Sequence, residues 1–177
     1  MKKIAIKGIE YHLPDTVLDN DELVANHPDW TSEKIFSKTG IAKRRLAADN
    51  ETAGDLAEKA ALKLFDSGVC KPEDVQFILL CTESPDYILP CTATLLQDRL
   101  NIPKTAGALD FNLGCSGFVY GLSLAKGLIE SGQVDNVLLI TSDTYSKFIE
   151  TDDIGVRAIF GDAAAATFYR EKSQIKS

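Results

Sequence analysis

Short apolar runs alternate along the chain with longer segments whose apolar residues recur at helical spacing. The clearest helix is predicted for residues 52–67, where leucines and alanines form one continuous apolar face. Thr52 and Asp55 have the spacing of a capping box at the start of this helix, and Gly68 is placed to end it. Residues 75–80 are almost all apolar and lie between turn residues, which is typical of a strand buried on both faces.

The remaining elements continue this alternation. Asn20 is predicted to cap a short helix that runs to Val24. Thr31 is predicted to cap a second helix, which stops at Gly40. Further helices are predicted at residues 92–100 and 116–131, and further strands at residues 1–7, 105–111, 137–140 and 163–169. Strands separated by helices imply βαβ units, so the fold class is predicted to be α/β, with a mostly parallel sheet covered on both faces.

The bulk composition fits one globular domain, predicted to span residues 1–177. A formal net charge of −7 argues against nucleic acid and anionic membranes as partners, because neither would attract the chain electrostatically. The basic start lacks the apolar region of a signal peptide and no apolar run is long enough to span a bilayer, so a cytoplasmic location is expected. The four cysteines form no CxxC pair and there are only two histidines, so neither a metal site nor a cofactor is predicted.

Cys115 carries the chemistry that the pattern suggests. It follows the predicted strand 105–111 and stands at the start of the predicted helix 116–131, where unpaired N–H groups and the helix dipole stabilise a thiolate. Gly114 and Gly117 leave room for a thioester to reach the sulfur and for backbone N–H groups to face an oxyanion. Spacing alone equally allows a small buried packing residue, since free cysteines are commonly buried. The other thiols are interpreted as structural or unreactive: Cys70, Cys81 and Cys91.

Residues 109–125, with the sequence LDFNLGCSGFVYGLSLA, closely resemble the active-site segment of the beta-ketoacyl-acyl-carrier-protein synthase III family. Other parts of the chain match this family in the same order: Tyr11–Pro14, Lys38–Ile41 with Arg44 and Arg45, Ser84–Tyr87 with Pro90, and Phe160–Ala163. The resemblance covers nearly the whole chain, and it favours the interpretation of Cys115 as a nucleophile.

The resemblance implies a thiolase-like fold, of which this chain is one half of a duplicated αβαβα layered architecture with a mostly parallel mixed sheet. It implies an acyltransferase of fatty acid biosynthesis in which Cys115 accepts an acyl group from acyl-CoA or acyl carrier protein. Malonyl-acyl carrier protein is then decarboxylated and condensed with that acyl group. The family's catalytic His and Asn belong to the second half, and His12 and His27 match no catalytic position, so the chain alone is expected not to condense. The alternatives are a non-decarboxylating thiolase-fold acyltransferase and a non-catalytic split subunit.

The resemblance also implies a set of substrate-binding residues: Lys38, Thr39, Leu89, Tyr145, Gly155 and Phe160. The family's adenine-stacking positions hold Lys34 and Ile154, with Trp30 out of register. Neither Lys34 nor Ile154 has a planar face that could stack on adenine, which favours a carrier-protein donor over acyl-CoA. The family is usually a homodimer joined through the strand before the nucleophile. Leu89 is expected either to shape the partner's acyl pocket or only to pack in that interface.

Overall fold

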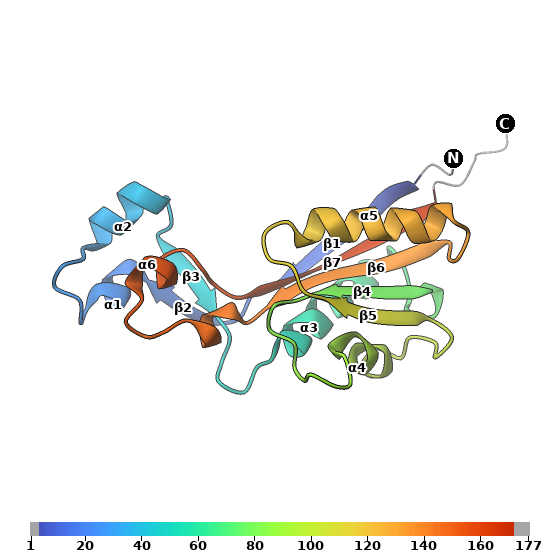
Figure 1. The fold of residues 1–177 in the computed structure, drawn as a ribbon, viewed down its shortest axis with the longest axis horizontal. Helices are drawn as coiled ribbons and strands as arrows, with labels where there is room; N and C mark the ends of the chain where they lie inside the picture. Colours follow the sequence, from blue (N-terminus) through green and yellow to red (C-terminus); the bar gives the residue numbers. More distant parts are fainter. Residues whose placement is uncertain (1–3, 172–177) are drawn as a thin grey trace.

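A five-stranded mixed sheet forms the body of the protein in the computed structural model, which describes residues 4–171. Its strands are β1 (Ile4–His12), β4 (Phe77–Cys81), β5 (Gly107–Phe111), β6 (Asn136–Asp143) and β7 (Ala163–Glu171), in the order β1-β7-β6-β4-β5 (Figure 1). β4 pairs in parallel with β5 and β6, whereas β7 is antiparallel to both β6 and β1. Every strand of this sheet except β7 therefore runs in one direction, which confirms the predicted α/β class and the mostly parallel mixed sheet.

Helices cover both faces of the sheet, as predicted. α3 (Ala53–Asp66) and α4 (Thr92–Arg99) lie on one face, and α5 (Gly117–Glu130) lies on the other (Figure 1). Successive residues of β4 serve different cores: Ile78 and Leu80 pack with α3 and α4, whereas Leu79 packs with α5. Within residues 4–171, no helix has the length and apolar character that crossing a membrane requires.

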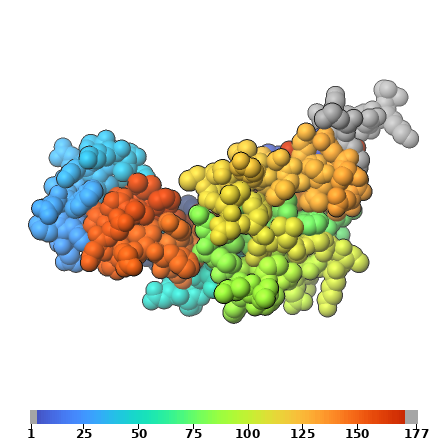
Figure 2. Space-filling view, viewed as in Figure 1, coloured from blue at the N-terminus to red at the C-terminus, as the bar shows by residue number. Residues whose placement is uncertain are grey.

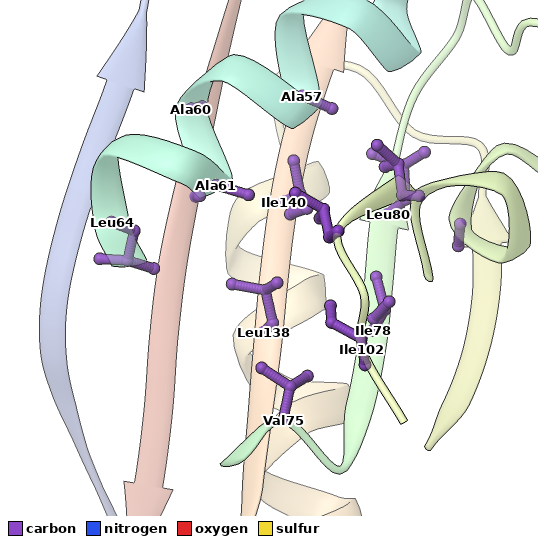
Figure 3. Close-up of a cluster of buried hydrophobic side chains, with 14 of the residues drawn as sticks. Ala57, Ala60, Ala61, Leu64, Val75, Ile78, Leu80, Ile102, Leu138 and Ile140 are labelled. Atoms are coloured by element: carbon purple, nitrogen blue, oxygen red, sulfur yellow. The ribbon is translucent and has the colours of Figure 1, made fainter. Parts of the chain in front are cut away.

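The sequence of α3 explains both its start and its close approach to the sheet. Asp55 N donates to Thr52 Oγ1 while Thr52 N donates to the Asp55 carboxylate, which confirms the predicted capping box. Gly68 follows the helix at φ 77°, in the left-handed region that favours glycine. Short side chains on the inner face let the helix lie close to the buried aliphatic residues of the strands, each worth about 1.5–3 kcal/mol when fully buried. Figure 3 shows this cluster: Ala57, Ala60, Ala61 and Leu64 of α3 with Leu138 and Ile140 of β6.

A small lobe lies at one end of the main body (Figures 1 and 2). It contains a two-stranded antiparallel sheet, β2 (Thr16–Asp19) and β3 (Lys43–Leu46), which is not among the elements predicted from the sequence. The helices α1 (Asn20–Val24), α2 (Ser32–Thr39) and α6 (Ile154–Arg157) pack with it, and the 3-10 turn η2 (Tyr145–Phe148) follows β6. The buried core of this lobe consists of Leu18, Leu23, Ile35, Ile154 and Ala158.

Several local predictions are wrong. The strand predicted at residues 1–7 extends from Ile4 to His12 within the described residues, and the strand predicted from Thr105 begins at Gly107. Asp19, not Asn20, caps α1, because the Asp19 carboxylate accepts a hydrogen bond from the backbone N–H of Glu22. Asn20 is instead buried: its amide donates to the Ile41 carbonyl, and its side-chain oxygen accepts from Arg44.

The strand predicted from Val75 begins at Phe77. The preceding residues, Pro72–Asp74, form the 3-10 turn η1, and Val75 N donates back to Pro72 O at 3.1 Å. The backbone of Val75 is thus occupied by the turn rather than by the sheet.

Candidate active site

Cys115 lies on the turn that joins β5 to α5, two residues before the first residue of that helix. Gly117 N donates to Gly114 O at 2.8 Å, and Ser116 has φ −86° and ψ −8°, which are the values of the third residue of a type I turn. Cys115 is therefore the second residue of the turn, and it is exposed. Its predicted place at the leading end of the helix is confirmed, and the alternative of a buried packing cysteine is wrong.

This position offers what an acyl-accepting thiol needs. Tyr120 N makes the first α-helical hydrogen bond, to Ser116 O at 3.1 Å, so the N–H groups of Phe118 and Val119 precede the helical ladder. The helix dipole adds partial positive charge at the same end. A thiolate and the oxyanion of a tetrahedral intermediate both carry negative charge, so this end of α5 favours both.

Two glycines let the start of α5 approach the sheet closely. A side-chain carbon at Gly117 would lie 2.2 Å from the sulfur of Cys81, and one at Gly121 would lie 2.6 Å from a methyl carbon of Leu139. A larger residue at either position would have to displace the helix or its neighbour. The glycines of this segment therefore fix how close Cys115 lies to the end of β4.

Cys81, the last residue of β4, is buried under this turn. Its thiol donates a hydrogen bond to the Leu113 carbonyl at 2.9 Å. Burial raises the pKa of Cys81. Cys81 is therefore held as a neutral thiol at neutral pH and acts as a hydrogen-bond donor. Cys70 is also buried, and burial raises its pKa to about 12, in keeping with its interpretation as structural.

Aspartates at the ends of two strands hold the segments around the turn. Asp110 of β5 accepts hydrogen bonds from Thr92 N and Ala93 N, both at 2.7 Å, and so caps α4. Asp143, the last residue of β6, accepts through one oxygen from the segment 82–84: Glu83 N at 2.7 Å, Ser84 Oγ at 3.0 Å, Ser84 N at 3.1 Å and Thr82 Oγ1 at 3.2 Å. Burial raises the pKa of Asp143 although these hydrogen bonds lower it. Neither aspartate is among the predicted site residues; the available signal was an aspartate at the end of an apolar strand.

The predicted substrate-binding residues are distributed over several elements. Lys38 and Thr39 end α2, and the Thr39 hydroxyl donates to Ile35 O at 2.9 Å while accepting from Ile41 N at 3.0 Å. Gly155 lies in α6 of the same small lobe. Leu89 lies on the loop between β4 and α4, where it is 84% exposed.

Tyr145 and Phe160 are the predicted residues that the structure brings into contact. Their ring centroids are 5.1 Å apart, with the planes tilted by 58°. Phe160 also lines a small cavity of about 70 Å³ together with Leu18, Leu46 and Arg157. The pair thus joins η2 to the segment that follows α6, beside the core of the small lobe.

The two positions expected to stack on adenine offer no open planar face. Ile154 is 2% exposed and belongs to the core of the small lobe. The ammonium group of Lys34 lies 5.0 Å from the centre of the Trp30 ring and donates to Asp29 O at 3.2 Å. A cation already covers one face of that ring.

The fold is one half of a thiolase-like layered architecture, with an exposed cysteine on the turn between β5 and α5. The chain is homologous to beta-ketoacyl-[acyl-carrier-protein] synthase III, and it corresponds to the amino-terminal half of such proteins, as its motifs predicted. The family model described as 3-Oxoacyl-[acyl-carrier-protein (ACP)] synthase III matches residues 109–176.

The relatives agree in sequence and in structure. The beta-ketoacyl-[acyl-carrier-protein] synthase III of Clostridioides difficile (strain 630) is 40% identical over 167 residues, which are 93% of this chain and 49% of that protein. A crystal structure of a 3-oxoacyl-(acyl-carrier-protein) synthase III is 55% identical with a TM-score of 0.95, over 97% of this chain and 51% of the other. The crystal structure of the 3-oxoacyl-[acyl-carrier-protein] synthase III from Aquifex aeolicus VF5 is 33% identical in sequence and superimposes with a TM-score of 0.89. The match covers 97% of this chain and 55% of that chain. The chain spans about half the length of these relatives.

Proposed function

We propose that this chain supplies the acyl-accepting cysteine of a 3-oxoacyl-[acyl-carrier-protein] synthase III in fatty acid biosynthesis. The thiolate of Cys115 attacks the carbonyl carbon of an acyl thioester, and the new S–C bond replaces the bond to the donor's thiolate, which leaves. Malonyl-acyl carrier protein then loses CO₂, and its carbanion attacks the acyl-enzyme. The 3-oxoacyl-carrier protein is released and the Cys115 thiolate is restored. The observation that carries this proposal is the exposed thiol at the start of α5.

The first half of this cycle is a direct test. The chain is incubated with an acyl thioester and digested with a protease, and the mass of the peptide that contains Cys115 is measured by mass spectrometry. We expect the mass of one acyl group on that peptide and none after Cys115→Ala, with Cys91 unmodified. Acylation of Cys91 instead, or of neither cysteine, would contradict the assignment.

The second half of the cycle needs groups that we place outside this chain. The family's His and Asn, which bind the thioester carbonyl and promote decarboxylation, belong to its second half. We therefore expect the chain alone to be acylated and yet to release no CO₂ from malonyl-acyl carrier protein. Release of CO₂ by the chain alone would disprove this division of labour. A non-catalytic subunit is separated from this proposal by the first measurement, because it is not acylated. A non-decarboxylating acyltransferase is separated from it by CO₂ release in an assembly that contains the second half, because such an enzyme is acylated there and still releases no CO₂.

The donor that we propose is carried by an acyl carrier protein rather than by coenzyme A. Ile154 is buried and the Lys34 ammonium group lies over the Trp30 ring, so neither of the two adenine-stacking positions supplies a planar stacking face. Lys38 keeps a positive charge for a phosphate, and Thr39, Tyr145, Gly155 and Phe160 are the proposed neighbours of the pantetheine arm. We expect acetyl-carrier protein to acylate Cys115 faster than acetyl-CoA at equal concentration. Equal rates, or tight binding of acetyl-CoA by calorimetry, would count against this donor.

We also propose that the protein acts as a homodimer, in which Leu89 reaches the partner's acyl pocket. β5 lies at the edge of the main sheet and Leu89 is 84% exposed, so both are available to a second copy. The expected results are a dimer in light scattering and, for Leu89→Phe, a loss of acylation by longer acyl donors with acetyl transfer retained. An unchanged preference for acyl length in a dimeric Leu89→Phe variant would leave Leu89 a packing residue.

A further inference from the structure

The turn that carries Cys115 rests on the end of β4 rather than on its own strand and helix alone. Thr82 N donates to Phe111 O at 3.2 Å, which extends the pairing of β4 with β5 by one hydrogen bond. One oxygen of Glu83 lies 2.8 Å from the place that a side-chain carbon on Gly114 would occupy. The residues after β4 thus lie against both the end of β5 and the first residue of the turn.

Cys81 makes the central contact of this arrangement. Its thiol donates to the carbonyl of Leu113, two residues before Cys115, at 2.9 Å. Its sulfur also fills the space beside Gly117, two residues after Cys115, where a side-chain carbon would lie only 2.2 Å away. A single buried sulfur therefore contacts the backbone on both sides of Cys115.

The end of β4 is itself held firmly. Asp143 accepts four hydrogen bonds from Thr82, Glu83 and Ser84, so the backbone that follows Cys81 is tied to the end of β6. Ser84 Oγ in turn accepts from Thr144 N at 2.8 Å. A shift of the Cys115 turn relative to β4 would break the bond to Leu113 O while the β4 end stayed in place.

We propose that Cys81 is a positioning residue for Cys115: its thiol fixes the Leu113 carbonyl and seats the first turn of α5, and so keeps Cys115 at the leading end of that helix. This inference rests on the proposed function, since it concerns the same nucleophile. Cys81 takes no part in covalent chemistry. The Cys81 residue is 3% exposed, and burial keeps its thiol protonated. The thiol therefore donates a hydrogen bond, which a thiolate could not do.

Alkylation of Cys115 by iodoacetamide tests this role without the condensation reaction. The rate constant is measured between pH 6 and pH 9 by peptide mass spectrometry, with Cys91 as internal reference, for the wild type, Cys81→Ala, Cys81→Ser and Cys70→Ala. Cys70→Ala is the matched control because Cys70 is another buried thiol. We expect Cys81→Ala to slow the alkylation of Cys115 at pH 7 by about three- to tenfold, the effect of losing one modest hydrogen bond. Cys81→Ser, which keeps a donor, should recover most of that rate, and Cys70→Ala should leave it unchanged.

Three outcomes separate the possibilities. An unchanged or faster rate in Cys81→Ala overturns the positioning role and leaves Cys115 as the proposed nucleophile. Equal slowing in Cys70→Ala also overturns it, because loosening of any part of the core would then explain the result. A wild-type Cys115 that reacts no faster than Cys91 overturns the proposed nucleophile and the role of Cys81 with it.

Discussion

Replacing Gly117 by alanine is the most direct physical test of how the turn that carries Cys115 is held. The added side-chain carbon would lie 2.2 Å from the Cys81 sulfur, so either the helix or the sulfur must move by roughly 1.2 Å to reach ordinary van der Waals contact near 3.4 Å. Overpacking of this kind costs about 1–3 kcal/mol of folding free energy. Cys81 has little freedom to move, because its residue is 3% exposed and its thiol is bonded to Leu113 O.

The matched control lies on the same helix. A side-chain carbon at Gly127 meets no atom within 4 Å, so Gly127→Ala should be neutral or stabilise α5 by up to about 1 kcal/mol through helix propensity. The free energy of unfolding of both variants is measured by urea denaturation.

A double variant identifies the sulfur as the cause. Cys81→Ala alone should cost about 1 kcal/mol for the lost hydrogen bond. Adding Gly117→Ala to it places the new methyl group where the sulfur was, so the double variant should be no less stable than Cys81→Ala alone. The resulting coupling free energy of about 1–3 kcal/mol, equal to the cost of Gly117→Ala alone, lies within the range for residues in contact. Strictly additive losses, or a Gly117→Ala variant as stable as the wild type, would refute the close contact.

Two further predictions concern the aspartates beside the turn. Burial raises the pKa of Asp143 above its value in the unfolded chain, so in the pH window between the two values the folded protein holds a proton that the unfolded chain has lost. The free energy of unfolding should therefore fall as pH rises through that window, starting near pH 4. Asp143→Asn should weaken this pH dependence, as measured by urea midpoints from pH 4 to pH 7. An unchanged pH dependence in Asp143→Asn would show that other groups cause it. Asp110→Ala should cost about 1–2 kcal/mol, because Thr92 N and Ala93 N lose their acceptor at the start of α4. Asp110→Asn should recover part of this loss, and an Asp110→Ala variant as stable as the wild type would rule out the cap.

The parts of the fold that could be predicted are those determined by local pattern. α3 has its capping box and its terminal glycine within a single stretch of sequence, and both are present in the structure. β2 and β3 could not be predicted from local pattern, because β3 has the polar sequence KRRL and gains its stability from contacts with residues distant in the chain. Arg44 of β3, for example, donates to Ala158 O, 114 residues later. The antiparallel direction of β7 could not be predicted either, since an apolar run indicates a buried strand but not the direction in which that strand runs.

The same distinction separates the two cysteines of the candidate site. Cys115 could be located from its neighbours alone, because two glycines and the change from strand to helix lie within a few residues of it. Cys81 looked like an ordinary core residue, since its contact with Leu113 spans 32 positions in the sequence and exists only once β4 and β5 pair in parallel. The pairing places Cys81 beside Phe111, at the point where β5 ends and the turn begins. The parallel sheet is thus what delivers a buried hydrogen-bond donor to the turn. The position of the exposed sulfur is therefore a property of the strand register as much as of the motif around Cys115.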